Sequence, residues 1–167
     1  LADKRKRPLE QLGGGQYTLY ELPRAFILVD HEDQHNPKLV YAMQYKLAFH
    51  RFIGRQCAQQ IAVWKDPTAL ITRGMATRIF GDHLLSTYKT VITDSMQTPD
   101  GQRFWDERIA EALSVGLYVY YVNLLPHREI TNITSVAEYK HLKGSKEIWG
   151  DESKHQARRI IITTSPL

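Results

Sequence analysis

The feature that most constrains the fold is a change of hydrophobic pattern near residue 66. Before it, the chain is rich in segments typical of β-strands, the longest being residues 39–49 (LVYAMQYKLAF). After it, apolar residues spaced by three and four alternate with short apolar runs, which indicates helices alternating with strands. A chain of 167 residues has the length of one domain. We therefore expect an α+β fold with a mixed, mostly antiparallel central sheet flanked by helices.

Before residue 66 the sequence predicts four strands, because each segment is β-rich and is bounded by turn-forming residues. Residues 39–49 carry the larger apolar side chains at odd positions. This period of two favours a strand with one buried face. Asn36-Pro37 would also suit the start of a helix, so a helix is the alternative there. The predicted strands are 17–20, 25–29, 39–49 and 60–65.

After residue 66 the helices carry clear boundary signals. One follows Gly74. The next begins at Thr98-Pro99-Asp100, which combine a hydroxyl cap, a proline and an acid in the first turn, and it ends before Gly116. Ser135 has capping-box spacing for a shorter helix. The apolar stripes are Met75, Ile79, Phe80, Leu84 and Tyr88 in the first helix and Trp105, Ile109, Ala112 and Leu113 in the second. Strands are predicted at 90–93, 117–124 and 158–164.

Residues 1–16 (LADKRKRPLEQLGGGQ) differ in composition from the rest of the chain. A basic cluster from Lys4 to Arg7 is followed by Pro8 and by three successive glycines, Gly13 to Gly15. Such a glycine run disfavours regular structure. We therefore expect a flexible, basic tail over residues 1–16 and a single folded domain over residues 17–167.

Composition limits the class of protein. The single cysteine, Cys57, excludes an internal disulfide and a zinc site built from several cysteines, and we expect a reducing, cytoplasmic compartment. No apolar run approaches the roughly 20 residues that span a bilayer, so no membrane partner is expected. The 22 Lys and Arg residues exceed the 18 Asp and Glu residues, for a formal charge of +4, which suits an anionic partner.

The basic residues suggest nucleic acid as that partner. The tail could contact a phosphate backbone, and so could a basic stretch near the carboxyl end. A solvated surface is the simpler interpretation of the same charges. The basic residues of the second stretch are Lys140, Lys143, Lys146, Lys154, Arg158 and Arg159.

A weaker alternative is a metal-dependent nuclease built on the segment 30–35. His31, Asp33 and His35 would share one face of an extended chain. They lie in a turn-rich stretch before Pro37, where such residue types are common in any case. The sequence has no Walker-type phosphate loop, no Gly-x-Ser-x-Gly elbow and no Cys-x-x-Cys pair, which argues against an ATPase, an α/β-hydrolase and a zinc finger.

The most informative local feature is a strand that ends near Trp64 and is followed by a glycine-containing turn and a helix. A helix start offers free backbone N–H groups and a partial positive charge, and both favour phosphate. Gly74 would let a ligand approach the backbone closely. Close packing of helix on strand is the alternative reason for a glycine there.

With this order of elements, the segment Ile71-Thr72-Arg73-Gly74-Met75-Ala76 resembles the pyrophosphate turn of the GNAT superfamily of acyl-CoA-dependent N-acyltransferases. That turn follows the family's fourth strand and reads Arg/Gln-x-x-Gly-x-Gly/Ala. Ile71 departs from the first position, and Arg73 is a substitute two residues later. The stretch from Val91 to Trp105 resembles divergent GNAT-like proteins of phages and mobile elements. The resemblance covers about residues 24–124.

The resemblance implies an acyltransferase that uses acetyl-CoA and acylates an amine of a protein, nucleic acid or small molecule. Main-chain groups of the fourth strand would orient the pantetheine arm. Amides of the turn and helix start would hold the pyrophosphate, and a base would take the amine proton. The pantetheine residues would be Ile61, Ala62, Val63 and Trp64, and the pyrophosphate residues Arg73, Gly74, Met75, Ala76 and Thr77. Asp94 is the first candidate base, although a capping role in the loop is its alternative; His50 and His83 follow, and no metal ligand is implied.

Two departures from the family support a non-catalytic alternative. The family usually has one or two helices between its first two strands, whereas only Leu22-Pro23 separates the candidates here. The helix tyrosine that often serves as the family's general acid aligns with Trp105, whose indole N–H does not donate a proton at ordinary pH; Trp105 also suits a core anchor. The alternative is a GNAT-like interaction module associated with a phage or mobile element.

Overall fold

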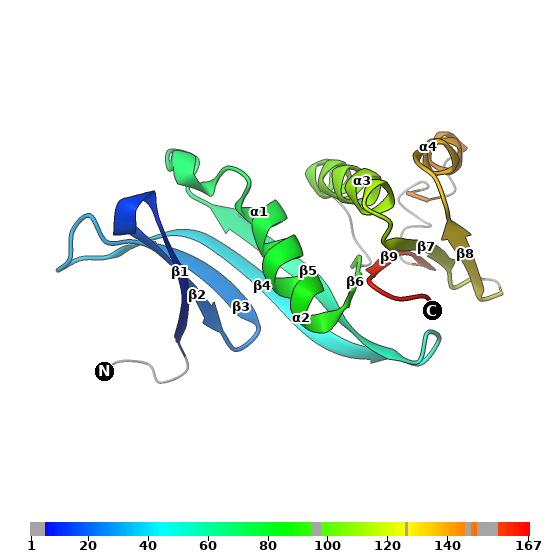
Figure 1. Ribbon diagram of the computed structural model, residues 1–167, viewed down its shortest axis with the longest axis horizontal. Coiled ribbons are helices and arrows are strands. Elements are labelled where there is room, and N and C mark those ends of the chain that lie inside the picture. Colours follow the sequence, from blue (N-terminus) through cyan, green and yellow to red (C-terminus); the bar gives the residue numbers. More distant parts are fainter. Residues whose placement is uncertain (1–5, 95–97, 126, 146–147, 150–156) are drawn as a thin grey trace. The chain divides into compact units, whose positions relative to one another are not determined.

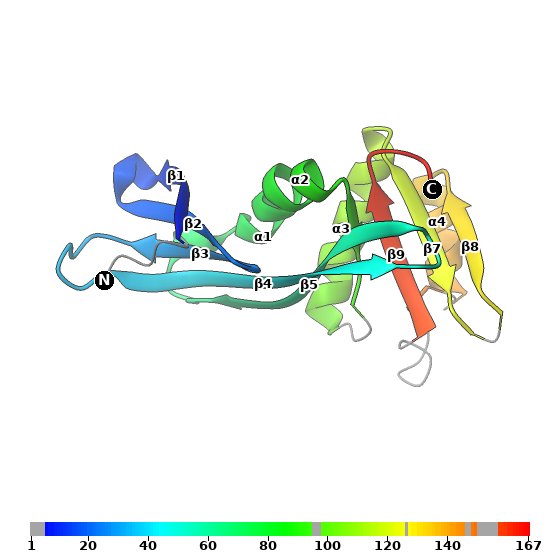
Figure 2. The same ribbon diagram turned by 90° about the horizontal axis from the view of Figure 1, so that it is seen from below.

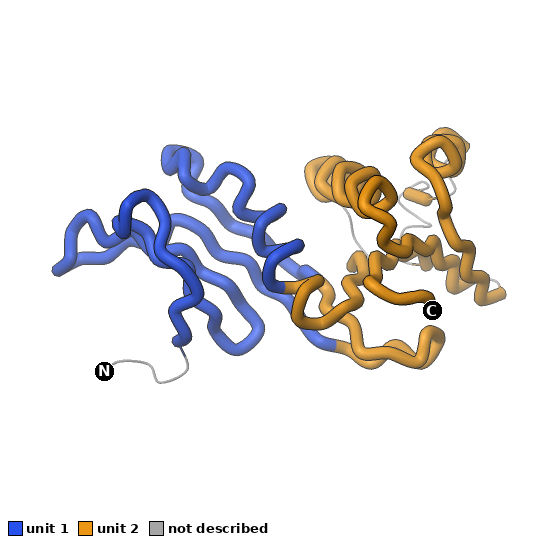
Figure 3. Tube along the Cα trace, viewed as in Figure 1, with its two compact units in different colours: residues 1–47, 60–83 blue, residues 48–59, 84–167 orange. Residues whose placement is uncertain are grey.

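The computed structural model describes residues 6–94, 98–125, 127–145, 148–149 and 157–167. The chain divides into two compact units (Figure 3). Unit 1 comprises residues 1–47 and 60–83, and unit 2 comprises residues 48–59 and 84–167. Two long strands, β4 (Lys38–His50) and β5 (Arg55–Lys65), contribute residues to both units. The fold is α+β with a mixed, mostly antiparallel sheet, as the sequence predicts.

Unit 1 begins with an antiparallel meander of β1 (Arg7–Leu12), β2 (Tyr17–Leu22), β3 (Ala25–Asp30) and β4 (Figures 1 and 2). Residues 38–50 form a strand, so the strand prediction for 39–49 is confirmed. Pairing aligns Leu19 with Leu28 and Leu28 with Tyr41, and all three are fully buried. Their shared face forms the apolar core of this unit.

The alternation predicted for residues 39–49 holds only in the middle of the strand. Tyr41, Met43 and Tyr45 are buried, whereas Leu39 and Phe49 near the ends are 42% and 64% exposed. A period-two pattern identifies the face of a strand on which a side chain lies. It does not show how far along the strand a covering layer extends.

The amino-terminal segment differs from the flexible tail expected over residues 1–16. Arg7–Leu12 forms β1 and pairs with β2, and the three glycines form the turn η1 (Gly13–Gly15) between them. Each of the three has a positive φ, which glycine adopts without steric cost. A Cβ at Gly13 would lie 2.9 Å from the Tyr17 ring. The glycine run is therefore the means of a tight reversal, and the part of the expected tail over residues 1–5 lies outside the described residues.

A helical segment follows β5. It comprises η2 (Leu70–Thr72), α1 (Met75–Arg78), the π-helical stretch η3 (Ile79–Leu85) and α2 (Ser86–Tyr88). Four members of the predicted stripe, Met75, Ile79, Phe80 and Leu84, are buried, and so is Leu85. The adjacent Leu84 and Leu85 both lie on the buried side of this π-helical stretch.

Unit 2 contains β6 (Thr90–Ile92), β9 (Arg158–Thr163), β7 (Tyr118–Asn123) and β8 (Glu129–Ile133), which follow β5 in the order β5-β6-β9-β7-β8. β6 is parallel to β5, and the other pairings are antiparallel. The other three strands are predicted from the sequence, and β8 is not. Its apolar residues, Ile130 and Ile133, are three positions apart, so the segment lacks the alternation that indicates a strand.

Two capped helices belong to unit 2. In α3 (Pro99–Ser114), Thr98 Oγ1 accepts a hydrogen bond from the Gly101 N–H at 3.1 Å. In α4 (Val136–Gly144), Ser135 Oγ accepts one from the Glu138 N–H at 3.1 Å. Both predicted helix starts are confirmed. The Asp106 carboxylate of α3 then accepts hydrogen bonds from Tyr139, Lys143 and Trp149, which ties α4 to α3.

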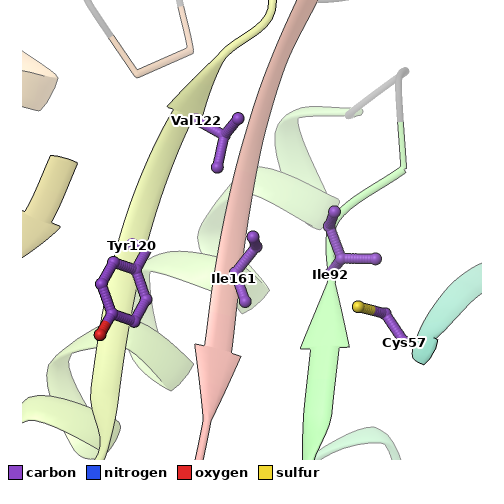
Figure 4. Close-up of a cluster of buried hydrophobic side chains, with 5 residues drawn as sticks. All are labelled: Cys57, Ile92, Tyr120, Val122 and Ile161. Atoms are coloured by element: carbon purple, nitrogen blue, oxygen red, sulfur yellow. The ribbon is translucent and has the colours of Figure 1, made fainter. Parts of the chain in front are cut away.

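A cluster of buried side chains forms part of the core of unit 2 (Figure 4). It brings together β5, β6, β7 and β9, and Phe52, Ile53 and Leu124 pack against it. Burial raises the pKa of the Cys57 thiol to about 11, so this cysteine is a core residue rather than a reactive group. The cluster consists of Cys57, Ile92, Tyr120, Val122 and Ile161.

Candidate acyl-CoA site and catalytic residues

The glycine turn in unit 1 has the backbone geometry of a helix start. Gly74 is the N-cap of α1 with φ 75° and ψ −4°, and its carbonyl accepts the Arg78 N–H at 3.0 Å. No side chain caps this helix start. The N–H groups of Met75, Ala76 and Thr77 belong to the first turn, where no intrahelical acceptor exists. They are the candidate phosphate donors of the sequence analysis.

Gly74 is needed for its conformation and not for close packing. A Cβ at this position would have no other atom within 4 Å, so the packing alternative is wrong. The positive φ disfavours every other residue type. Gly74 and Arg73 are both exposed. The space in front of the turn is therefore open to a ligand, and a larger side chain would project into it.

The candidate pantetheine residues lie in the second half of β5, in unit 1 as well. Ile61, Ala62, Val63 and Trp64 are all exposed. The parallel pairing of β5 with β6 comprises two residue pairs, Ala58 with Val91 and Gln59 with Ile92, whereas β5 continues to Lys65. The structure thus places both halves of the predicted cofactor site in one unit, on a strand and on the helix start that follows it.

Of the candidate bases, His83 belongs to the same unit. Its ring stacks on Phe26 at 5.5 Å between centroids, and its Nε2 lies 4.0 Å from Glu10 Oε1. Glu10 also forms an ion pair with Arg78 of α1. The His83 side chain retains 21% exposure, which leaves it accessible to a ligand.

The other two candidate bases, Asp94 and His50, lie in unit 2. Asp94 interacts electrostatically with Arg159. Burial lowers the pKa of the Arg159 guanidinium, and the negative charge of Asp94 partly opposes this shift. The main chain of His50 accepts the N–H groups of Ile53 and Gly54 in the β4–β5 turn, and its ring contacts Phe52. Each residue therefore has a structural role inside its own unit.

The charged neighbours of these bases were missed by sequence reasoning. Glu10 precedes His83 by 73 residues, and Arg159 follows Asp94 by 65 residues. No local spacing signal links such pairs. The sequence predicts a flexible tail around Glu10, and only the place of this residue in β1 brings it to the helical segment.

The stretch from Val91 to Trp105 is described except for residues 95–97. Trp105 is 3% exposed within α3, together with Ile109 and Ala112. It is a core anchor, as the simpler of the two interpretations predicts. The hydroxyl that the resemblance would place at this point is therefore replaced by a buried indole.

The turn after β3 has the geometry of a hydrogen-bonded loop. Asp30 Oδ1 accepts the Glu32 N–H and Asp33 Oδ1 accepts the His35 N–H, while His31 Nε2 lies 3.3 Å from the Tyr20 hydroxyl. Among the described residues, no group of three or more His, Cys, Asp and Glu side chains is placed to hold a metal ion. The nuclease alternative gains no support from this turn.

Several basic residues proposed as a nucleic-acid surface have internal contacts. Lys6 lies over the Tyr20 ring at 3.7 Å, and Arg7 pairs with Glu21. Lys143 pairs with Asp106. Residues 1–5, Lys146 and Lys154 lie outside the described residues. None of the helices in the described part of the chain is long and apolar enough to cross a membrane.

Comparison with known proteins adds no relative to this picture. No family model, no curated protein and no solved structure matches the chain. A functional conclusion for this chain therefore rests on its own sequence and geometry.

Proposed function

We propose that the chain is a GNAT-like N-acyltransferase that uses acetyl-CoA to acylate an amine of a protein, nucleic acid or small molecule. One observation carries the proposal. A strand with an exposed second half is followed by a helical segment in which the N-cap of α1 is a left-handed glycine facing open space. This is the arrangement in which the resemblance places a pantetheine arm and a pyrophosphate.

The order of elements supports the same proposal. β5 and β6 are parallel neighbours joined through the helical segment that contains Gly74, and their pairing stops after two residue pairs. A strand that leaves its neighbour exposes main-chain N–H and C=O groups. An amide-bearing arm such as pantetheine can pair with those groups as a strand would.

The chemistry requires little beyond positioning. The amine nitrogen attacks the thioester carbonyl carbon, the C–S bond breaks, and the CoA sulfur leaves with the electron pair and gains a proton. Holding the two reactants together supplies much of the rate. Of the candidate bases, His83 belongs to the unit that contains the proposed cofactor residues, and it would take the proton that the amine loses; Asp94 and His50 are the candidates of unit 2.

Thermal denaturation with and without acetyl-CoA tests the binding half of the proposal. At a concentration about 100-fold above the dissociation constant, a ligand adds roughly 2.7 kcal/mol. For a chain of this size that corresponds to a rise of about 5–10 °C in melting temperature. No rise at about 1 mM acetyl-CoA, the upper end of the ordinary range of KM values, contradicts the proposal.

Two glycine variants form a matched pair for this experiment. Gly74 (φ 75°) and Gly116 (φ 77°) are both left-handed, and a Cβ at either would have no other atom within 4 Å. Gly74→Ala and Gly116→Ala should each lower stability by about 1–2 kcal/mol. Only Gly74→Ala should also remove the rise with acetyl-CoA, because only its methyl group enters the proposed pyrophosphate position.

The buried Trp105 favours a second candidate, a GNAT-like binding module without catalysis. This module would bind acyl-CoA as the first candidate does. Release of free CoA thiol in the presence of amine acceptors separates the two. A rise in melting temperature without thiol release from any amine would favour the module, and loss of release in His83→Ala would favour the enzyme.

A further inference from the structure

We infer that the open edge of β5 pairs with a second copy of this chain, antiparallel and centred on Ala62, and that this pairing blocks the proposed acyl-CoA site. The residues concerned, 60–64, are named here the edge segment. The pairing rests on the strand and its side chains alone, whereas the block of cofactor binding rests on the proposed function.

The edge segment has a neighbouring strand on one side only. β5 lies between β4 and β6 in the sheet, and its pairing with β6 comprises Ala58 and Gln59. Among the described residues, no strand pairs with the β6 side of residues 60–64. The main-chain N–H and C=O groups on that side form a template to which a further strand can add.

Both faces of the edge segment are uncovered. Residues 61–64 are all exposed, with Ile61 and Trp64 at 50% and Val63 at 41%. Successive side chains of a strand point to opposite faces, so neither face is packed against protein. A second strand can therefore lie alongside without displacing a covering layer, and it removes apolar area from water.

The opposite edge of the sheet in unit 1 is protected against such pairing (Figure 1). Its strand, β1, contains Pro8, which has no N–H to donate, and its register shifts between Pro8 and Glu10. Lys6 and Arg7 add positive charge at its start. Proline, irregular pairing and charge are the usual protections of an edge strand, and residues 60–64 contain neither proline nor charge.

An antiparallel pairing of two edge segments places matching side chains opposite each other. A two-fold axis through Ala62, perpendicular to the sheet, pairs each residue with one on the same face. Ile61 then lies opposite Val63 of the second copy, and Trp64 lies opposite Gln60. Each pair occurs twice, and pairs of β-branched side chains stabilise antiparallel strands. The edge segment is therefore complementary to its own copy.

The neighbouring registers match less well. A pairing centred on Val63 places the cation of Lys65 opposite Ile61, twice. A pairing centred on Ile61 extends to Gln59, which is already paired with β6. The register centred on Ala62 uses only the free part of the strand and keeps apolar residues opposite apolar ones.

The pairing also brings a donor to an unmet acceptor. Gln60 Oε1 is buried and has no hydrogen-bond partner within the described residues, and a buried acceptor without a donor costs free energy. The Trp64 indole N–H is a donor only. Side chains directly opposite in antiparallel strands have Cβ atoms about 4.5–5.5 Å apart, so the second copy places an indole donor beside this amide.

The charge of the edge segment favours a second copy over an anionic partner. Residues 60–64 are uncharged and offer no cation to a phosphate. In the pairing centred on Ala62, Lys65 lies opposite Gln59 of the second copy, so the two Lys65 side chains are about 20 Å apart along the strands. This separation exceeds the Debye length of about 8 Å at physiological salt, so their repulsion is screened.

The small area predicts a weak dimer. Covering a half-exposed tryptophan removes on the order of 100 Å² from water. Pairing over five residues stays below the roughly 1,200 Å² at which specific, stable interfaces begin. We therefore expect a dissociation constant above about 1 μM, with monomers at high dilution.

Cysteine cross-linking tests the pairing and its register. In a Cys57→Ala background, Ala62→Cys places two thiols directly opposite each other, with Cα atoms about 4.5–5.5 Å apart, a distance that a disulfide spans. Oxidised glutathione should cross-link this variant at about 100 μM chain, above the expected dissociation constant. Val63→Cys, with Cα atoms about 7–8 Å apart, should react more slowly, and Lys65→Cys should react slowest.

Sedimentation equilibrium measures the reversible dimer without any cross-link. Ala62→Lys places like charges directly opposite each other and should weaken association by about fivefold or more. Ala62→Gln is the matched control, because it adds a side chain of similar length without charge, and it should associate as the wild type does. Thermal melts of the dilute variants check that each is folded.

Acetyl-CoA at about 1 mM, the upper end of ordinary KM values, should shift the wild-type chain toward the monomer. The reason is that pantetheine and the second copy need the same main-chain groups of β5. Gly74→Ala should dimerise as the wild type does, and acetyl-CoA should leave its dimer intact.

Three outcomes would overturn the pairing: a wild-type chain that stays monomeric up to about 500 μM, far above the expected dissociation constant; equal cross-linking of Ala62→Cys and Lys65→Cys; and wild-type association of Ala62→Lys. A dimer that binds acetyl-CoA without dissociating would overturn the block alone. A melting temperature that rises with acetyl-CoA in a chain that never dimerises supports the proposed function and contradicts this inference. A dimer with no such rise does the reverse for the proposed function and the pairing.

Discussion

The two halves of β5 differ in a way that their sequences do not suggest. In the first half, Cys57, Ala58 and Gln59 are buried, although Gln59 is polar. In the second half, Ile61, Val63 and Trp64 are 41–50% exposed, although this half is the more apolar. Burial along this strand therefore follows what lies beside it and not how apolar it is.

The neighbours of each half explain the difference. Ala58 and Gln59 pair with β6, and the Gln59 side-chain amide donates a hydrogen bond to the Thr93 carbonyl at 3.3 Å. A buried amide is tolerated when it is bonded in this way. The second half of β5 extends beyond the residues that pair with β6. Exposed apolar residues on such a segment suit contact with a ligand.

The largest expected effect comes from removing the packing of the first half. Ile92→Ala deletes a fully buried side chain of the core cluster that includes Cys57 and should cost about 2–5 kcal/mol of unfolding free energy. Ile61→Ala in the second half should change it by less than about 0.5 kcal/mol. Urea denaturation of both variants measures the contrast. Similar losses in the two variants would show that the second half is also packed against protein.

The Cys57 thiol lies in the first half of β5, so the two halves can also be compared by the reactivity of a cysteine in each. The pKa of Cys57 is raised to about 11 by burial, so its thiolate fraction at pH 8 is roughly 200-fold below that of an ordinary thiol. Cys57 should react with a thiol reagent only as fast as the native state opens. In a Cys57→Ala background, Val63→Cys should react at the rate of an exposed cysteine.

The same thiol predicts a pH dependence. Its native pKa is raised, so the unfolded chain loses this proton first. Wild-type stability relative to Cys57→Ala should be constant below about pH 8.5 and should fall as pH rises toward 11. Rapid labelling of Cys57 in the native state, or no such fall, would contradict its burial.

Much of the fold was predictable because its signals are local. The caps at Thr98 and Ser135 and the alternation around Tyr41 depend on residues a few positions apart. The turn at Gly13–Gly15 is not predictable, because it depends on a pairing between two strands that local sequence does not show. A glycine run has the same appearance in a loose tail as in a tight reversal, and only the pairing of β1 with β2, across the turn, decides between them.

The candidate site was predictable as far as its backbone is concerned. Gly74 and the exposed half of β5 are consecutive features of one segment. The surroundings of the candidate bases were not predictable, because Glu10 approaches His83, and Arg159 approaches Asp94, from strands far away in the sequence. The apolar run that predicts this strand also does not indicate that Ile61 and Trp64 are exposed.

The smallest expected loss of stability concerns the hydrogen bonds of Asp66, which fix the end of the exposed half of β5. The Asp66 N–H donates to the Val40 carbonyl at 2.9 Å, and its carboxylate accepts from Lys38 Nζ at 2.7 Å and from the Thr68 N–H and hydroxyl. Hydrogen bonds from Lys38 and Thr68 hold the pKa of Asp66 well below its usual range. Asp66→Asn should therefore lower stability at neutral pH, although less than Ile92→Ala does.

The sign of the pH dependence separates this network from ordinary surface charge. The native carboxylate binds protons less readily than the unfolded one, so its contribution is present above about pH 4 and is lost as pH falls below that value. The difference in unfolding free energy between wild type and Asp66→Asn should shrink over this range. Glu107→Gln, at a carboxylate that is 70% exposed, should show little difference from wild type at any pH. A constant Asp66→Asn deficit across the whole range would mean that shape, and not charge, fixes the end of the strand.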